Sequence, residues 1–267
     1  MKCNINFHTY SRVWIKKENV AINFTVHKQV DFSVQATDSI FDYGLGARDT
    51  QGLPLYRHTE QGKRIDNITS WALKKFTENY QFDKEQKITK EAIFHYCYAV
   101  LHDPVYREKY ALNLKREFPR IPFYADFWQW AVWGERLMAL HIGYENIEPF
   151  KLERVDIEDT KARTAGQQPK AMLKADADAG SITLDSETSL RGIPKEAWTY
   201  KLGNRCAIDW VLDQYKEKKP KDPTIREKFD TYRFADYKEK VIDLLARVTT
   251  VSVETAQITD AMRDLER

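Results

Sequence analysis

Apolar and polar residues alternate through much of residues 1–36, with the period of two that is typical of β-strands. A glycine-rich stretch follows, and Leu53-Pro54-Leu55-Tyr56 then predicts another short strand. We therefore expect the chain to begin with a β-rich lobe. The apolar positions that carry the alternation are Val13, Ile15, Val20, Ile22, Phe24, Val26, Phe32 and Val34.

From residue 65 onwards the apolar residues recur at helical spacing. Residues 65–82 place Ile68, Trp71, Ala72 and Phe76 on one side of an amphipathic segment. A helix is predicted after Thr89, because threonine is a good N-cap.

A second helix is predicted to begin at Asp103-Pro104, with aspartate as the N-cap and proline at the first helical position. Tyr106, Tyr110 and Leu114 are spaced four apart and predict one buried stripe. Pro119 ends this helix, and Arg120-Ile121-Pro122-Phe123 is expected to be extended, because a residue before proline avoids the α region.

A third helix is predicted after Asp126. Its stripe ends at His141, and Trp128 and Trp133 lie off the stripe, so most of its circumference is apolar. We expect His141 to be a core or capping histidine, because no partner has metal-ligand spacing. The same holds for His95 and His102. The stripe consists of Phe127, Trp130, Gly134, Leu137 and His141.

The second half of the chain begins with a polar stretch, residues 143–169, that we interpret as a linker. Four short apolar runs then predict a small antiparallel sheet, and Gly203-Asn204 predicts a turn followed by an N-cap. The C-terminal stripe predicts a helix that the β-branched residues 248–251 could divide in two. The four runs are Ala171–Lys174, Ser181–Leu184, Ser189–Ile193 and Trp198–Leu202.

These patterns predict an α+β fold with an N-terminal β-rich lobe, a central helical bundle, a small antiparallel β segment and C-terminal helices. The expected domains are residues 1–142, with the β segment and the helical core, and residues 170–267, with the small β segment and the C-terminal helices. Residues 143–169 join them.

The composition is that of a globular protein: 31% of the 267 residues are charged and 42% are hydrophobic. The longest apolar runs are too short to cross a membrane, and the first residues lack the pattern of a signal peptide. Cys3, Cys97 and Cys206 lie far apart, which argues against disulfides and zinc. We expect a cytoplasmic protein with no metal, no cofactor and no contact with membranes.

The formal net charge is only +2, but the charges are unevenly distributed. Residues 105–120 carry a basic excess, whereas residues 145–159 are acidic. Such a division favours a molecule that turns one face towards phosphate groups. Ordinary solvated helix faces explain it equally well at this point.

A resemblance adds to this pattern. The run IFHYCYAVLHDPVYREKYALNLKREFPRIPF, residues 93–123, resembles the C-terminal target-recognition (specificity) domain of Type ISP restriction–modification enzymes. Three further stretches resemble that family in the same order. They are Asp38-Ser39-Ile40 with Pro54-Leu55-Tyr56, then GIPKEAWTYKLGNRCAIDWVLDQYKEK at residues 192–218, and the C-terminal helix around residues 248–258.

Enzymes of this family carry a nuclease, a translocase, an adenine methyltransferase and a DNA-recognition domain in one polypeptide. The resemblance implies a sequence-specific double-stranded DNA recognition domain without catalysis of its own. Its partners would be methyltransferase and helicase/nuclease domains of the same or a companion polypeptide. Motifs for methyl transfer (Asn-Pro-Pro-aromatic) and ATP hydrolysis (GxxxxGK[ST]) are absent from the sequence. Glu85-Gln86-Lys87 has the Glu-x-Lys spacing of a nuclease site but lacks the preceding Pro-Asp.

The expected contacts with DNA divide into two classes. Arginine can bind guanine with two hydrogen bonds and asparagine can bind adenine in the same way. Intramolecular ion pairs, of Arg120 with Glu117 or Asp126 and of Arg205 with Asp209, are the alternative. We expect phosphate contacts from Arg107, Lys109, Lys115, Arg116 and Arg120, and base contacts from Arg48, Arg57, Lys63, Arg64, Asn204 and Arg205.

A protein-interaction scaffold is the alternative function. It would join enzyme domains through the tryptophan-rich third helix and the C-terminal stripe, and it would not bind DNA.

Overall fold

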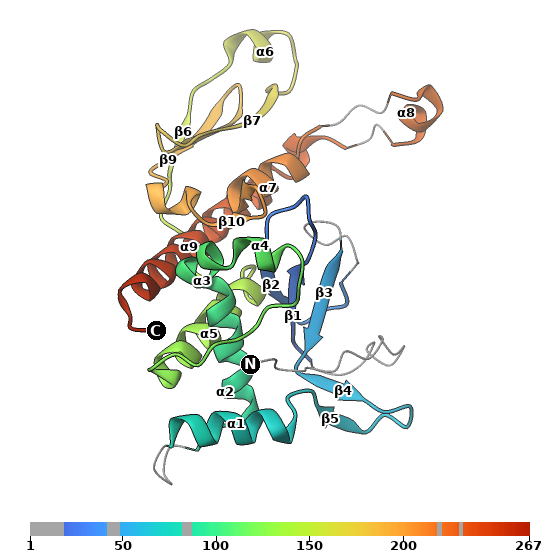
Figure 1. Cartoon of the computed structure of the whole chain (residues 1–267). Helices are drawn as coiled ribbons and strands as arrows, with labels where there is room; N and C mark the ends of the chain where they lie inside the picture. The colour runs from blue at the N-terminus through green and yellow to red at the C-terminus, as the bar shows by residue number, and fades with distance from the viewer. Residues whose placement is uncertain (1–18, 42–48, 82–86, 218–220, 230–231) are drawn as a thin grey trace. The chain divides into compact units, whose positions relative to one another are not determined.

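The computed structural model describes residues 19–41, 49–81, 87–217, 221–229 and 232–267. The chain forms two compact units. The first holds the described residues up to Gly143, with Leu202–Asn204 and Gln257–Arg267, and the second holds Tyr144–Lys201 and Arg205–Ala256. Both contain helices and small antiparallel sheets, so the fold class is α+β, as predicted (Figure 1).

A three-stranded antiparallel sheet begins the first unit. Its central strand β1 (Ala21–Thr25) lies between β2 (Val34–Thr37) and β3 (Thr50–Pro54). All five residues of β1 are buried, so the predicted alternation does not separate a buried from an exposed face there. Val13 and Ile15, also predicted in strands, lie outside the described residues.

A separate hairpin follows, formed by β4 (Tyr56–His58) and β5 (Arg64–Asp66). The run predicted as one strand at residues 53–56 is thus divided between β3 and β4 at the buried Leu55. Gly62, with φ of 79°, adopts the left-handed conformation that closes the hairpin turn. The hairpin projects away from the helices of this unit (Figure 1).

Three helices form the core of the first unit: α1 (Ser70–Tyr80), α2 (Lys90–His102) and α5 (Phe127–Ile142). Thr89 and Asp126 cap α2 and α5 through their side chains, as predicted. Trp71, which was expected on the buried side of its helix, is 49% exposed instead. The structure begins α1 at Ser70, so Ile68 precedes the helix and the predicted stripe does not lie on one continuous helix.

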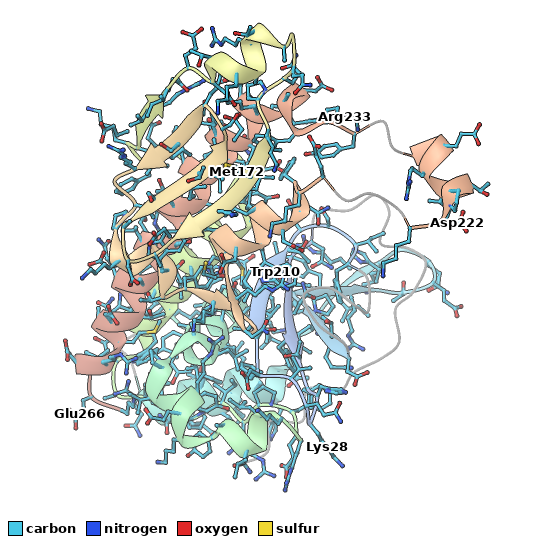
Figure 2. All side chains as sticks on the ribbon, turned by 90° about the horizontal axis from the view of Figure 1, so that it is seen from above. Lys28, Met172, Trp210, Asp222, Arg233 and Glu266 are labelled. Carbon is cyan, nitrogen blue, oxygen red and sulfur yellow. The ribbon has the colours of Figure 1, made fainter. Side chains whose placement is uncertain are left out.

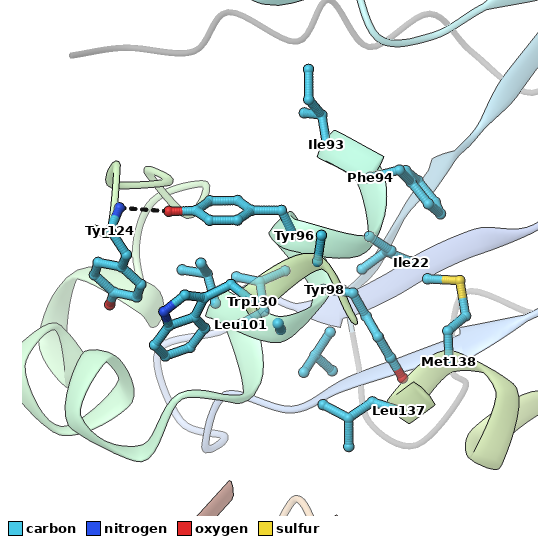
Figure 3. Packing of buried hydrophobic residues seen from close by; sticks show 14 of the residues in the cluster. Ile22, Ile93, Phe94, Tyr96, Tyr98, Leu101, Tyr124, Trp130, Leu137 and Met138 are labelled. Atoms are coloured by element: carbon cyan, nitrogen blue, oxygen red, sulfur yellow. Dashed lines mark hydrogen bonds between the residues drawn. The ribbon is translucent and has the colours of Figure 1, made fainter. Parts of the chain in front are cut away.

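Helices α2 and α5 pack closely, and Gly134 makes this possible. A Cβ atom at position 134 would lie 1.8 Å from the carbonyl oxygen of His95. Aromatic side chains fill the space around the contact, and Tyr96, Tyr98 and Trp130 have no exposed surface (Figure 3).

The helix predicted from Asp103 is divided into α3 (Pro104–Lys109) and α4 (Ala111–Leu114). Asp103 caps α3 as predicted, with Pro104 in the first turn. Tyr106 and Leu114 are buried, but Tyr110 is 37% exposed. The spacing of four predicts a single stripe only on a continuous helix, and the backbone leaves helical geometry at Tyr110, with ψ of 18°.

The second unit is built on a four-stranded antiparallel sheet with the order β6-β9-β8-β7. Strands β7 (Ala171–Asp176), β8 (Ser181–Asp185) and β9 (Thr188–Arg191) correspond to three of the predicted runs. Edge strand β6 (Glu153–Asp156) and the short helix α6 (Thr160–Thr164) lie within the stretch interpreted as a linker. The fourth run, Trp198–Leu202, begins at the last residue of a 3-10 helix, Lys195–Trp198, and only its Lys201–Leu202 forms a strand, β10.

The remaining elements of the chain are mainly helical. Strand β11 (Arg205–Cys206) pairs with β10 and leads into α7 (Ala207–Gln214), followed by α8 (Pro223–Phe229), a 3-10 turn (Phe234–Asp236) and α9 (Lys238–Asp264). The side chains on these elements are drawn in Figure 2.

Helix α9 is continuous, so the predicted interruption at residues 248–251 is wrong. Val241, Leu245 and Val248 lie in the core of the second unit. Buried Thr249 and Ser252 donate hydrogen bonds to the carbonyl oxygens of Leu245 and Val248, at 2.7 and 2.8 Å. Burial of this helix outweighs the low helix propensity of its β-branched residues.

Candidate nucleic-acid interface

The predicted phosphate-binding residues lie on one segment of the first unit, residues 107–120, which we call the basic segment. Lys109 and Arg116 are exposed and form no ion pair within the part of the chain that the structure describes. The Lys109 ammonium lies 5.5 Å from the centre of the Tyr110 ring. These two cations are therefore available to an external anion.

Lys115 and Arg120 are also on the basic segment but have carboxylate partners. Lys115 Nζ lies 2.8 Å from Asp31 Oδ1, and Arg120 donates to Glu117 Oε2 at 2.8 Å. The intramolecular pair that was considered for Arg120 is thus present with Glu117. Exposed pairs of this kind contribute little energy, so a phosphate group can compete for either cation.

Arg107 faces the protein more than the solvent. Its Nε donates to the Leu101 carbonyl oxygen at 2.7 Å, and its guanidinium carbon lies 5.5 Å from the centre of the Phe32 ring. The side chain is only partly exposed. Of the five predicted phosphate ligands, Arg107 therefore has the clearest structural role.

Tyrosine hydroxyls hold the chain that follows the basic segment. Tyr106 donates to the Arg120 carbonyl oxygen at 3.0 Å, and Tyr96 donates to that of Pro122 at 2.9 Å. The Tyr96 oxygen also accepts from the Tyr124 backbone N–H at 2.7 Å, which Figure 3 marks with a dashed line. Burial raises the pKa of Tyr106 to about 12 and raises that of Tyr96 further, so both remain hydroxyl donors near neutral pH. These hydrogen bonds thus anchor the C-terminal end of the basic segment at Arg120.

The β4–β5 hairpin carries three of the predicted base-reading residues. Lys63 and Arg64 are exposed, and the Arg64 guanidinium lies 4.2 Å from the centre of the Tyr56 ring. Arg57 is half-buried, and its buried Nε has no acceptor among the described residues. A two-stranded ribbon of this kind fits the major groove of DNA.

The remaining base-reading candidates are separate from the hairpin in sequence. Arg48 lies outside the described residues. Asn204 is exposed in the β10–β11 turn and is not the N-cap that was predicted, because Cys206 caps α7 by accepting from the Asp209 N–H at 3.4 Å. Arg205 Nη1 lies 3.5 Å from Asp213 Oδ2, so its partner is Asp213 and not Asp209. The guanidinium carbon of Arg205 lies 5.4 Å from the ring centre of Trp210, which Figure 2 labels.

Burial moves the pKa values of His141 and Cys206 away from neutral pH. Burial lowers the pKa of His141 to about 3, and Tyr98 Oη and His141 Nδ1 lie 2.6 Å apart. Burial raises the pKa of the Cys206 thiol to about 11, which suppresses the reactive thiolate. No group of three metal-ligating side chains occurs in this part of the chain.

Comparisons with known proteins identify the family. The model of the Type ISP C-terminal specificity domain matches residues 4–244. This chain belongs to that family.

Solved structures match this chain over part of much longer chains. A cryo-EM structure of a DrdV–DNA complex matches with 53% identity and a TM-score of 0.85, over 94% of this chain and 25% of that one. A nuclease-deletion mutant of the Type ISP enzyme LlaGI, in complex with a DNA substrate mimic, matches with 25% identity and a TM-score of 0.69, over 94% and 22%. LlaBIII, an ATP-dependent Type ISP enzyme bound to DNA, has the same fold, with 23% identity and a TM-score of 0.72, over 94% and 16%.

This specificity domain therefore spans a quarter or less of the length of each of those three chains. No curated protein matches it. Among the helices of the described residues, none has the length and apolar character needed to cross a membrane.

The structure adds two residues to the specificity domain's basic segment that the sequence did not indicate. Leu112 and Asn113 on α4 are both exposed. In a single continuous helix they would have been ordinary solvated positions. The break at Tyr110, which precedes both residues, is marked by no proline or glycine in the sequence.

Proposed function

We propose that this specificity domain recognises a sequence in double-stranded DNA and directs a restriction–modification methyltransferase and nuclease to it, without catalysis of its own. The single observation that carries the proposal is the match to the Type ISP C-terminal specificity domain over residues 4–244. The DNA complexes formed by DrdV and by LlaGI support it.

The basic segment would bind phosphate groups. Lys109 and Arg116 have no carboxylate to displace in the described residues, and Lys115 and Arg120 would exchange exposed carboxylate partners for phosphate. Contacts of this class fix the register of a protein on the duplex but do not read its sequence.

Base edges would be read from the β4–β5 hairpin and from the β10–β11 turn. Lys63 and Arg64 are the exposed cations of the hairpin, and a bidentate arginine–guanine contact discriminates by about 1–3 kcal/mol. Arg48, Arg57, Asn204 and Arg205 complete the proposed set.

The alternative scaffold function receives less support from the packing of α5. Trp130 has no exposed surface, and Trp128 and Trp133 pack against the core of the first unit. The tryptophans that were considered as a docking surface are therefore largely used within this unit.

The test is selection of the purified chain against a random duplex pool, with the affinity followed from low to moderate salt. We expect enrichment of one short motif and an affinity that falls with salt. Binding without enrichment, or no binding at low salt, would contradict sequence recognition by this chain.

The phosphate role is tested by the double variant Lys109→Ala, Arg116→Ala. We expect it to weaken binding to all duplexes alike. The slope of the logarithm of the binding constant against the logarithm of salt concentration should become shallower by about two, because two phosphate contacts are lost. The matched control is Lys74→Ala, Arg263→Ala, which removes the same charge from α1 and α9, where both side chains lie beside carboxylates. Equal effects of the two double variants would show that the basic segment does not contact the DNA.

A further inference from the structure

Helix α4 presents an apolar side chain and an amide side by side to solvent. Leu112 is 72% exposed, the largest fraction among the exposed large apolar side chains of the described residues. Asn113 is exposed as well, and its side-chain amide has no hydrogen-bond partner in that part of the chain. Removing an exposed leucine from water is favourable, so this side chain leaves stabilisation unused in the free protein.

Both residues are held in place by buried neighbours. Tyr106 and Leu114, on either side of the pair, are 3% and 2% exposed. The Leu114 N–H donates to the Tyr110 carbonyl oxygen at 2.9 Å, and the Asn113 carbonyl oxygen accepts from the N–H groups of Arg116 and Glu117. The pair is therefore ordered before any partner binds, which lowers the entropic cost of binding.

The surroundings of the pair indicate an anionic partner. The exposed cations Lys109 and Arg116 lie three residues before Leu112 and three residues after Asn113. Lys115 and Arg120 add further positive charge on the same segment. An exposed leucine and amide between cations match the major groove of DNA, where phosphates flank base edges that carry methyl, donor and acceptor groups.

We propose that Leu112 and Asn113 read A·T base pairs in the major groove. The Asn113 amide would accept a hydrogen bond from adenine N6 and donate one to adenine N7, and Leu112 would contact the 5-methyl group of thymine. This assignment rests on the proposed function and adds two specificity-determining residues to it.

The test combines variants of the chain with a change in the DNA. After the preferred motif has been selected with the unchanged chain, Asn113→Ala should lose about tenfold to a hundredfold of its preference at one A·T position. Replacing the contacted thymine by deoxyuracil removes only the methyl group. It should weaken binding by the unchanged chain but not by Leu112→Ala. Asn146→Ala and Ile157→Ala, which alter an exposed amide and an exposed apolar residue of the second unit, should select the original motif.

The outcomes separate this inference from the proposed function. Failure of the unchanged chain to select any motif would overturn both. Selection of the same motif with the same preferences by Leu112→Ala and Asn113→Ala would overturn the base-reading assignment alone. A loss of affinity that is equal on every duplex would also overturn it, because that is the signature of phosphate contact.

Discussion

Asp103 is a buried carboxylate that joins three parts of the first unit. It has no exposed surface, and it accepts from the Val105 N–H at 3.0 Å as the N-cap of α3. Tyr124 donates to it at 2.8 Å, and the Arg267 guanidinium contacts both oxygens, at 2.7 and 3.0 Å. A buried charge of this kind is stable only while its partners remain.

We therefore expect Asp103→Ala to lower the free energy of unfolding by about 3–5 kcal/mol, because the arginine and the tyrosine lose their shared acceptor. Urea denaturation measures this. Glu117→Ala serves as the control, since the pair of Glu117 with Arg120 is exposed and should be worth about 1 kcal/mol or less. Similar losses in the two variants would show that the Asp103 cluster contributes no more than a surface pair.

His102 makes the stability of this domain depend on pH. Burial lowers its pKa well below 6.5, with further contributions from His141 and Arg107. The unfolded chain consequently takes up the proton first as the pH falls, so the stabilisation is present above about pH 6.5 and is lost below it.

Unfolding free energy should fall from pH 7 to pH 5, with a slope from His102 of up to about 1.4 kcal/mol per pH unit. His102→Asn can still donate to the Tyr98 carbonyl oxygen but cannot take up a proton, so its slope should be smaller whatever its overall stability. Urea midpoints at several pH values measure the slope. An unchanged slope in the variant would contradict this role of His102.

Single residues are where the sequence predicted the structure best. Thr89, Asp103 and Asp126 cap helices as expected, because capping depends only on the residue and the few N–H groups after it. The cap of α7 was not predicted, because the residue type at that position gives only a weak capping signal. A cysteine is a weak acceptor, and Cys206 serves as the cap although the exposed Asn204 lies two residues earlier.

At the scale of secondary-structure elements, the close contact of α2 with α5 depends on the absence of a side chain at Gly134. The predicted stripe of α5 included Gly134. Spacing alone could not predict that this glycine contacts the backbone of His95. In a solvated helix, alanine would be more stable than glycine by about 1 kcal/mol. At this position the added methyl group has no space.

Gly134→Ala should therefore destabilise the protein, by about 1–3 kcal/mol or more, since the two helices must move apart. A lower melting temperature would report this. Val132→Ala on the same helix alters a 55% exposed side chain and should have little effect. A variant at position 134 that melted at or above the temperature of the unchanged protein would contradict the close contact.

Element boundaries were predicted less well than element types, because tertiary contacts decide them. The break between α3 and α4 has no local signal, and the expected break in α9 is absent because that helix is buried. Strand β6 was missed because four largely exposed residues, Glu153–Asp156, gain their strand geometry only from pairing with β9.

For the molecule as a whole, charge distribution matters more than total charge. The formal net charge of +2 gives little general attraction to DNA, so the proposed binding to DNA depends on local cations. The basic segment was predicted from the sequence because a run of like charge is visible there. The ion pairs of Lys115 with Asp31 and of Arg120 with Glu117 depend on the fold.

If Lys109, Lys115, Arg116 and Arg120 are the phosphate ligands, the logarithm of the binding constant should fall with the logarithm of salt concentration with a slope of about −3 to −4. Titrations of one duplex at several salt concentrations give this number. A slope near zero would contradict phosphate binding, and a much steeper one would require cations beyond this segment.

Strand β6 has a practical consequence for exchanging recognition modules between related enzymes. Its residues Glu153–Asp156 cover one edge of the second unit's sheet by pairing with Thr188–Arg191. A hybrid protein joined at residue 170, where the polar stretch ends, would lack β6. The backbone N–H and C=O groups of β9 would then be free to pair with strands from other molecules. Hybrid proteins joined there would tend to aggregate. A junction before Tyr144 would instead keep β6 together with its sheet.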